Sequence, residues 1–325
     1  MTVPTGTFQT AQQIGLREDL EDIIYDISPT ETPFATMISK GKAKATYHEW
    51  QTDALDSAAA NAAIEGDDAT TNTAVPTVRL RNYCQILTKT VRVSGTAEAV
   101  DKAGRDSEMA YQVRKRMEEL KRDLEYAMVR NQSSSGGNGS STAARLAGVE
   151  SWIATNKTSV GTGTSQTTPG FASGTVAAPT DSTVTGTLTE AALKSVIQAV
   201  WNAGGDPKVL MVGPATKSKI STAFSGVATR YRDVPAGKQA QVISGVDLYV
   251  SDFGSHRIVP NRFMRDLNIL CLDMDYWELA RLRPLFMTPL AKTGDSDRKQ
   301  MLMEVTLVSR NEKANGKVSD INPAL

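Results

Sequence analysis

Apolar residues at helical spacing predict one long helix in the first half of the chain. The positions that recur every three or four residues are Met109, Val113, Met117, Leu120, Leu124 and Met128. Residues of opposite charge stand four apart on the polar side, in the pairs Arg114–Glu118, Glu118–Arg122 and Lys121–Glu125. We expect a helix over residues 106–131, with Asp106 as its N-cap and a length of about 40 Å.

A shorter apolar stripe lies near the start of the chain. Its members are Leu16, Leu20, Ile23, Ile24 and Ile27, and acidic residues occupy much of the opposite side. Pro29 and Pro33 then end the predicted helix. One short helix between irregular flanks cannot bury its stripe alone, so it must dock on another surface. That surface belongs either to the rest of the chain or to a neighbouring subunit.

Two extended segments, residues 45–53 and 78–93, predict a long β-hairpin with a loop of small residues between them. Neither strand alternates cleanly between apolar and polar positions. A two-stranded ribbon is marginal alone, so the hairpin needs a partner surface. The loop of the hairpin is acidic, and its second strand is basic. The acidic positions are Asp53, Asp56, Glu65, Asp67 and Asp68, and the basic ones are Arg79, Arg81, Lys89 and Arg92.

The second half of the chain mixes helical and extended patterns. Residues 155–188 are rich in Thr, Ser, Gly, Ala and Pro, which predicts a disordered linker or a long surface loop. Thr187 and Glu190 fit a capping box for a helix that ends at Gly204 and Gly205. The apolar face of that helix is Leu193, Val196, Ile197, Val200 and Trp201. A further helix is expected over residues 214–224, and strands over 208–212, 246–251, 256–260, 267–272, 277–282 and 300–309. This order of elements indicates an α+β fold.

Composition excludes several classes of protein. Lys plus Arg and Asp plus Glu each total 36, so the net charge of +0 lacks the basic excess of a protein that reads DNA sequence. Balanced charge suits a protein that packs against its own copies. Cys84 and Cys271 are far apart in sequence and predict two buried or half-buried thiols in a reducing cytoplasm. The first residues do not resemble a signal peptide, and no apolar run approaches the roughly 20 residues of a membrane helix.

No catalytic, metal or cofactor site is predicted. His48 and His256 are the only histidines, and neither has the spacing to Cys or Glu of a metal site. The Gly-rich segments lack the Lys-Ser/Thr of a phosphate loop, and no G-x-S-x-G motif occurs. Asp295 and Asp297 favour a tight turn with Gly294 over a cation site. We therefore do not expect an enzyme.

Four stretches of sequence resemble the major capsid proteins of tailed double-stranded DNA phages. They are EDIIYDISPTETPF at 21–34, YHEWQTDAL at 47–55, VSDFGSHRIVPNRFM at 250–264 and MTPLAKTGDSDRKQMLMEVTLVSRNEKANGK at 287–317. That family has the Hong Kong 97-like fold. The resemblance covers nearly the whole chain and is least specific over residues 155–188.

The resemblance assigns each region a place in that fold. It implies an N-terminal arm over residues 1–44, an extended loop (a β-hairpin) over 45–93 and an axial domain over 188–268. The peripheral domain would combine residues 94–187 and 269–325, with a spine helix over 106–131 and a Ser/Thr/Gly-rich insertion over 155–187. The turn at residues 288–298 would meet neighbouring subunits at three-fold points.

The implied function is structural. Copies of the chain would assemble as hexamers and pentamers into an icosahedral phage head around double-stranded DNA, in the cytoplasm of the host cell. Implied partners are the chain itself, portal, scaffolding and decoration proteins, and DNA held without sequence recognition; no membrane is involved. No fused scaffold segment and no isopeptide cross-linking pair are identified, so a non-covalent shell is expected. An encapsulin-like nanocompartment and a β-rich tail or fibre component are the alternatives.

Residues expected at contacts between subunits lie on the hairpin, the spine helix and the late turn. They are Trp50, Asp53, Asp56, Glu65, Asp67, Asp68, Arg79, Arg81, Arg114, Arg116, Lys121, Lys292, Asp295, Asp297 and Arg298. Because the loop is acidic, we hypothesise that its tip lies on a neighbour's basic surface, formed by Arg114, Arg116 and Lys121.

Overall fold

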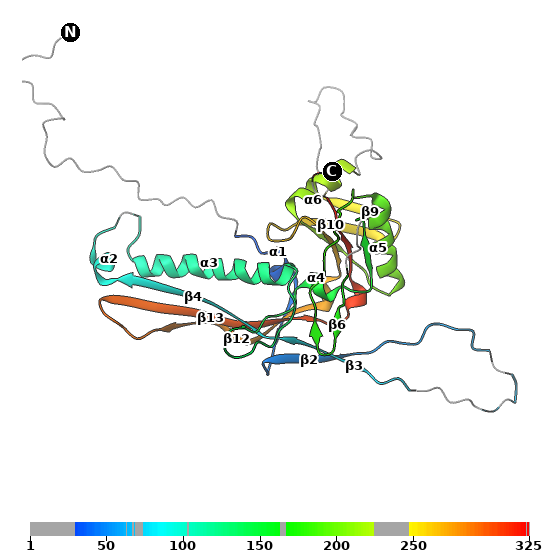
Figure 1. Cartoon of the computed structure of the whole chain (residues 1–325), viewed down its shortest axis with the longest axis horizontal. Helices are drawn as coiled ribbons and strands as arrows, with labels where there is room; N and C mark the ends of the chain where they lie inside the picture. The colour runs from blue at the N-terminus through cyan, green and yellow to red at the C-terminus, as the bar shows by residue number, and fades with distance from the viewer. Residues whose placement is uncertain are drawn as a thin grey trace, which may run out of the picture.

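A computed structural model describes residues 30–62, 64–66, 68, 74–102, 104–162, 167–222, 247–322 and 324, with the backbone of residue 223. Within these residues the chain forms a long four-stranded sheet with one helix along it, and a six-stranded sheet with helices beside it (Figure 1). The predicted α+β class is confirmed. The amphipathic helix predicted over residues 16–27 lies outside the described residues.

The long helix is α3 (Glu108–Val129), and its predicted apolar face is confirmed. Met109, Leu120, Leu124 and Met128 are buried, and the two remaining stripe residues pack against the same core. The N-cap is Ser107, whose hydroxyl accepts a hydrogen bond from the Ala110 amide, so the prediction of Asp106 was wrong by one residue. At about 1.5 Å per residue the helix spans roughly 33 Å.

The sheet beneath α3 has the strand order β1-β12-β13-β4. These strands are β1 (Ser39–Lys42), β12 (Trp277–Pro289), β13 (Ser296–Ser309) and β4 (Gln85–Ser94). β12 and β13 form a long antiparallel ribbon, and both extend further toward the turn than the sequence predicted. The turn itself is therefore confined to residues 290–295 rather than 288–298.

The predicted hairpin is present, but its second strand is shorter than expected. β2 (Tyr47–Thr52) pairs antiparallel with β3 (Val78–Tyr83), with Tyr47 opposite Tyr83. β3 ends before the buried Cys84. After Cys84, β4 pairs with β13 in the four-stranded sheet. The prediction of one strand over residues 78–93 was wrong, because its two halves satisfy their backbone hydrogen bonds in different sheets.

The second sheet has the order β5-β14-β11-β8-β10-β9. Its strands are β5 (Lys157–Ser159), β14 (Gly316–Ser319), β11 (Ile269–Leu272), β8 (Val209–Val212), β10 (Gly254–Pro260) and β9 (Leu248–Ser251). Helix α5 (Glu190–Asn202) and helix α6 (Pro214–Ala223) pack on one face of it. The strands and helices predicted here are confirmed to within a few residues.

Two details of α5 differ from the prediction. Its N-cap is Thr189 rather than Thr187, because the Thr189 hydroxyl accepts from the Ala192 amide. Trp201 is 55% exposed and packs beside Phe253 at a ring distance of 5.4 Å, so it is not on the buried face. The predicted end of the helix is confirmed, since Gly204 has φ +88°, a conformation that favours glycine.

The described residues of the Ser/Thr/Gly-rich segment pack against the body, which contradicts the disordered linker, but most of them are irregular and exposed or half-buried, as the surface-loop alternative predicted. β5 joins the six-stranded sheet, and β6 (Phe171–Ala172) and β7 (Thr175–Val176) form a small hairpin. Val176 is fully buried in the main core, the apolar cluster that includes the buried face of α3 and residues of β4, β12 and β13. The small polar side chains bond to distant backbone and side chains; for example, the Asn156 amide donates to Lys313 O at 2.6 Å.

Short helices complete the fold. They are α1 (Pro33–Met37), α2 (Gly95–Ala99), α4 (Val149–Trp152) and the 3-10 helices η2 (Met274–Tyr276) and η3 (Glu312–Ala314). α1 lies against the C-terminal half of α3, at the junction between the two sheets (Figure 1).

A buried carboxylate on α3 fixes α1 in place. Glu125 accepts hydrogen bonds from the amides of Phe34 and Ala35, each at 2.8 Å, and from the Asn261 side chain at 2.6 Å. Thr32 makes no side-chain cap, so Glu125 supplies the acceptor that the first turn of α1 lacks. The predicted Lys121–Glu125 surface pair is therefore wrong. Burial raises the pKa of Glu125, and the three donors oppose that shift.

Replacing Glu125 by Ala should lower the free energy of unfolding by about 3 kcal/mol, because three buried donors lose their acceptor. The matched control is Glu118→Ala, since Glu118 lies on the outer side of the same helix and pairs with an arginine at 3.7 Å. Such an exposed pair contributes at most about 1 kcal/mol. Urea unfolding of the unassembled subunit measures both, and equal losses would contradict the anchoring role.

Candidate assembly surfaces

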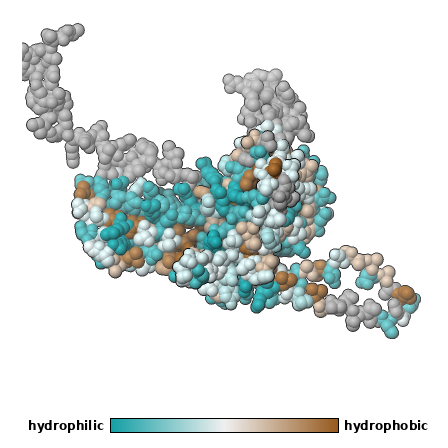
Figure 2. Space-filling view, viewed as in Figure 1, coloured by the Kyte–Doolittle hydropathy of each residue, from teal (hydrophilic) through white to brown (hydrophobic). Residues whose placement is uncertain are grey.

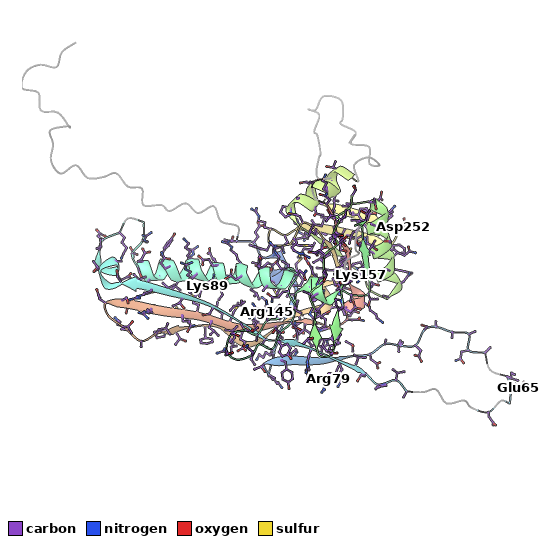
Figure 3. The ribbon with its side chains drawn as sticks, in the orientation of Figure 1. Glu65, Arg79, Lys89, Arg145, Lys157 and Asp252 are labelled. Atoms are coloured by element: carbon purple, nitrogen blue, oxygen red, sulfur yellow. The ribbon has the colours of Figure 1, made fainter. Side chains whose placement is uncertain are left out.

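The loop of the β2–β3 hairpin extends away from the body, and Figure 3 shows Glu65 at its far end and Arg79 at its root. Apolar side chains along the loop are uncovered, with Leu55 99%, Ile64 79% and Val75 70% exposed; some of this apolar surface is visible as brown patches in Figure 2. Exposed apolar residues on a projecting loop mark a surface for a partner.

The acidic loop candidates stand as follows. Asp53, Asp56, Glu65 and Asp68 are exposed, and Asp67 lies outside the described residues. Asp53 Oδ1 accepts a hydrogen bond from the next amide, which shapes the start of the loop. The structure thus places the described carboxylates along one projecting segment.

The root of the hairpin is attached to the body by aromatic stacking. Trp50 packs on Trp152 at a ring distance of 5.4 Å, and Trp152 stacks on Phe171 at 6.2 Å. Arg81 Nε donates to the Gly174 carbonyl at 2.7 Å. Trp50 and Arg81, both expected at contacts between subunits, therefore have contacts within the chain.

An open groove of about 430 Å³ lies beside this root. Its apolar lining includes Pro76, Val78, Trp152 and Phe171. Arg79 is exposed nearby and lies 3.7 Å from Glu49 on the paired strand. The root of the hairpin thus packs on the body, while the described residues of the loop beyond it are exposed.

The basic candidates on α3 share their surface with carboxylates. Arg114 lies 3.7 Å from Glu118, and Arg116 lies 2.6 Å from Glu119. Lys121 is exposed on the same helix. Lys89 reaches up from β4 to Asp123 at 2.7 Å and joins the sheet to the helix (Figure 3). A neighbour would meet a mixed-charge surface here rather than a purely basic one.

The candidates in the β12–β13 turn and at the start of β13 stabilise the turn itself. Lys292 pairs with Asp297 at 2.6 Å, and Arg298 donates to Thr293 Oγ1. The Asp295 carbonyl accepts from the Gly95 amide at 3.3 Å, which joins the turn to α2. Gly294 has φ +89°, as the predicted tight turn requires. In the described part of the chain, no three His, Cys, Asp or Glu residues cluster as metal ligands would.

A buried ionic network that the sequence analysis missed joins α4 and the segments after β7 and β10 to β14. Arg265 binds Glu150 at 2.5 Å and Asp181 at 2.6 Å. Lys317 is fully buried and donates to the Glu150 carbonyl at 2.9 Å and to Thr168 Oγ1 at 2.7 Å. Some of the bonded pairs are more than 100 positions apart in the sequence, so no local spacing predicts the network.

Burial also shifts the pKa of other groups. It lowers the pKa of Lys317 to about 8. It raises the pKa of Cys84 to about 11, with Glu304 as a smaller cause, and that of Cys271 to about 12. Both cysteines are buried and free, which confirms the predicted buried thiols. Protonated buried thiols are poor nucleophiles.

Among the described helices, none is long and apolar enough to cross a membrane.

Known structures place this architecture in one fold. The capsid asymmetric unit of cyanophage A-1(L) aligns with a TM-score of 0.69 at 11% identity, covering 96% of this chain and 98% of that chain. The holo-SrpI encapsulin complex of Synechococcus elongatus PCC 7942 aligns with a TM-score of 0.57 at 10% identity, covering 97% and 95%. The fold is therefore the Hong Kong 97-like fold of capsid proteins.

Sequence then identifies the family. The pattern of the SU10 major capsid protein family matches residues 3–322, and the chain belongs to that family. The major capsid protein of Escherichia phage Phieco32 is 29% identical over 343 aligned residues, covering 97% of both chains. The resemblance found in the sequence is confirmed: the protein is a phage major capsid protein, and its role is structural.

The pH dependence of stability should reveal the lowered pKa of the buried Lys317 amine. Between pH 8 and about 10.5 the unfolded chain binds more protons at Lys317 than the folded chain, so stability from this group rises with pH. The free energy of unfolding of the native protein minus that of Lys317→Met should increase by about 3 kcal/mol across this range. Urea titrations at each pH measure it, with the exposed Lys313→Met as control. A difference that is flat with pH would contradict the shift.

Proposed function

We propose that this major capsid protein assembles as hexamers and pentamers into a closed icosahedral head that encloses double-stranded DNA. The observation that carries the proposal is the exposed hairpin loop, because the part of the chain that the structure describes leaves Leu55, Ile64 and Val75 uncovered. A second copy supplies such a surface without any additional protein.

Assembly of this kind uses many modest contacts. A single standard interface buries about 1,600 Å². A subunit that extends a loop and a ribbon turn toward several neighbours makes several such contacts at once, so their combined strength exceeds that of each contact. Ordering of the loop on docking weakens each contact and allows misplaced subunits to dissociate.

The domain assignment is part of the proposal. Residues 45–83 would act as the extended loop, and residues 84–94 would belong with α3 to the peripheral domain. Residues 188–268 would form the axial domain, with the six-stranded sheet shared between it and later strands. The support is the strand pairing, since β4 is bonded to β13 and not to β2.

Further partners follow from the closed shell. The portal, scaffolding and decoration proteins would contact it, DNA would lie inside it without sequence recognition, and assembly would take place in the cytoplasm of the host cell. We propose no catalytic activity and no covalent cross-link. The two buried, protonated thiols support the absence of a nucleophilic cysteine and of disulfide links between subunits.

An encapsulin-like compartment is the second candidate, because an encapsulin shares the fold at a TM-score of 0.57. The family match and the phage relative favour the phage head. Electron microscopy of particles purified from cells should show closed shells, and nuclease-protected double-stranded DNA should be present in heads that mature in infected cells. Shells that hold protein cargo and no DNA after infection would overturn the phage-head proposal, and open fibres would overturn both candidates.

The acidic loop is proposed to contact α3 of a neighbour. Changing Asp67 and Asp68 to Lys should reduce the yield of particles severalfold and leave the circular dichroism of the subunit unchanged. Each exposed pair contributes only about 0–1 kcal/mol, but the shell repeats it many times. The compensating variant adds Arg114→Glu and Lys121→Glu, and it should restore the yield. Normal yield from the first variant, or no recovery with the second, would contradict this contact.

A further inference from the structure

One face of the six-stranded sheet is only half covered. Over β8 and β11 it packs into the main core, where Met211, Leu270 and Leu272 meet residues of α1 and α3. Over β9 and the first part of β10 the described residues leave the same face uncovered, whereas Val259 near the end of β10 is buried. Leu248 is 57% exposed and Val250 is 70% exposed.

Strand register shows that these open residues share that face. Leu248 stands opposite Arg257, and Val250 stands opposite Ser255. Directly opposed residues of antiparallel strands point to the same side. Their neighbours Tyr249 and His256 point to the other side, where their rings lie 6.2 Å apart. β9 is also the last strand of the six-stranded sheet, so this face continues to the edge of that sheet.

A pocket of about 350 Å³ continues this face toward α1. It is lined by Glu31, Thr32, Pro33, Thr36, Met37, Arg257 and Val259. The pocket and the exposed part of β9 together form what we call the open strip: Met37, Val259, Arg257, Leu248 and Val250. The described chain begins at residue 30, on the rim of this pocket.

We propose that the apolar stripe of residues 16–27 docks on the open strip of its own chain as an amphipathic helix. The proposal does not depend on shell formation. The stripe is Leu16, Leu20, Ile23, Ile24 and Ile27, and a helix of this length is marginal unless it packs on something.

Chain length supports an intramolecular contact. Four residue steps separate Ile27 from Glu31, and they reach at most about 14 Å. A helix over residues 16–27 is about 18 Å long. Adjacent strands of a sheet are about 4.8 Å apart, so a helix that starts beside the pocket spans β10 and β9. The short connection therefore keeps the stripe at high local concentration beside the open strip.

The charges of residues 16–27 also favour docking on the open strip. Residues 16–27 contain one basic residue, Arg17, and five acidic ones: Glu18, Asp19, Glu21, Asp22 and Asp26. Arg257 is exposed in the middle of the open strip. The acidic Asp247 beside β9 is already paired with Lys217 at 2.8 Å. A helix with an acidic flank can thus bury its stripe and place carboxylates near Arg257.

The test measures how fast a cysteine on the open strip reacts with a maleimide. Val250→Cys is made in the full chain, and the reaction is followed by mass spectrometry on dilute, unassembled subunits. The two native cysteines are buried and unreactive controls. We expect Val250→Cys to react about tenfold more slowly than Ser140→Cys, an exposed reference in another loop. Adding Ile23→Asp and Ile24→Asp should remove the protection.

A matched control variant carries the same added charge off the stripe, as Gln12→Asp and Gln13→Asp, and it should keep the protection. Three results would overturn the proposal. The first is Val250→Cys reacting as fast as the reference in the native chain. The second is protection that persists after the stripe is disrupted, which would mean that another segment covers the strip. The third is protection that disappears on dilution, which would assign the contact to a second copy.

Discussion

The carboxylate of Glu125 is the contact on which the arrangement of this subunit depends. It lies in the core, where a charge is costly unless donors surround it, and three donors from two distant segments do so. Two of them begin α1 and the third comes from Asn261, just after β10. One side chain of α3 therefore holds both α1 and the end of β10 against that helix.

From that junction the structure extends in opposite directions. The β12–β13 ribbon and α3 run one way, tied together by Lys89 and by the apolar face of α3. The β2–β3 hairpin runs the other way from an aromatic root (Figure 1). The far end of the ribbon is bonded to α2 and β4, whereas the described residues of the hairpin loop are exposed beyond a packed root. A packed root fixes where the loop starts and leaves its exposed residues available to a neighbour.

Regular periodicity was sufficient to predict the elements that pack through an apolar face. The stripe of α3 and the buried strand β8 follow directly from spacing, and so does the end of α5 at Gly204. Prediction failed where hydrogen bonds between residues far apart in the sequence determine the structure. Local spacing paired Glu125 with Lys121, although its partners lie 90 and more positions away. Likewise, nothing local divides residues 78–93 between two sheets.

At residues 155–188, composition predicted the surface loop but not which small polar side chains would form hydrogen bonds within the chain. In the structure they bond to backbone and side chains of the C-terminal strand region, as Ser159 does with Asp320 at 2.5 Å. The candidate contact residues divide in a similar way. Charge patterning located the loop and the helix surface, but it could not show that Trp50 and Arg81 are already engaged inside the chain.

The central claim is that one copy of this chain leaves its hairpin loop for other copies to cover. Hydrogen–deuterium exchange on unassembled subunits and on purified shells tests it most directly. We predict that the backbone amides of residues 54–77 exchange rapidly in the free subunit and become strongly protected in the shell, while β8 is protected in both. Equal exchange of residues 54–77 in the two states would contradict the account.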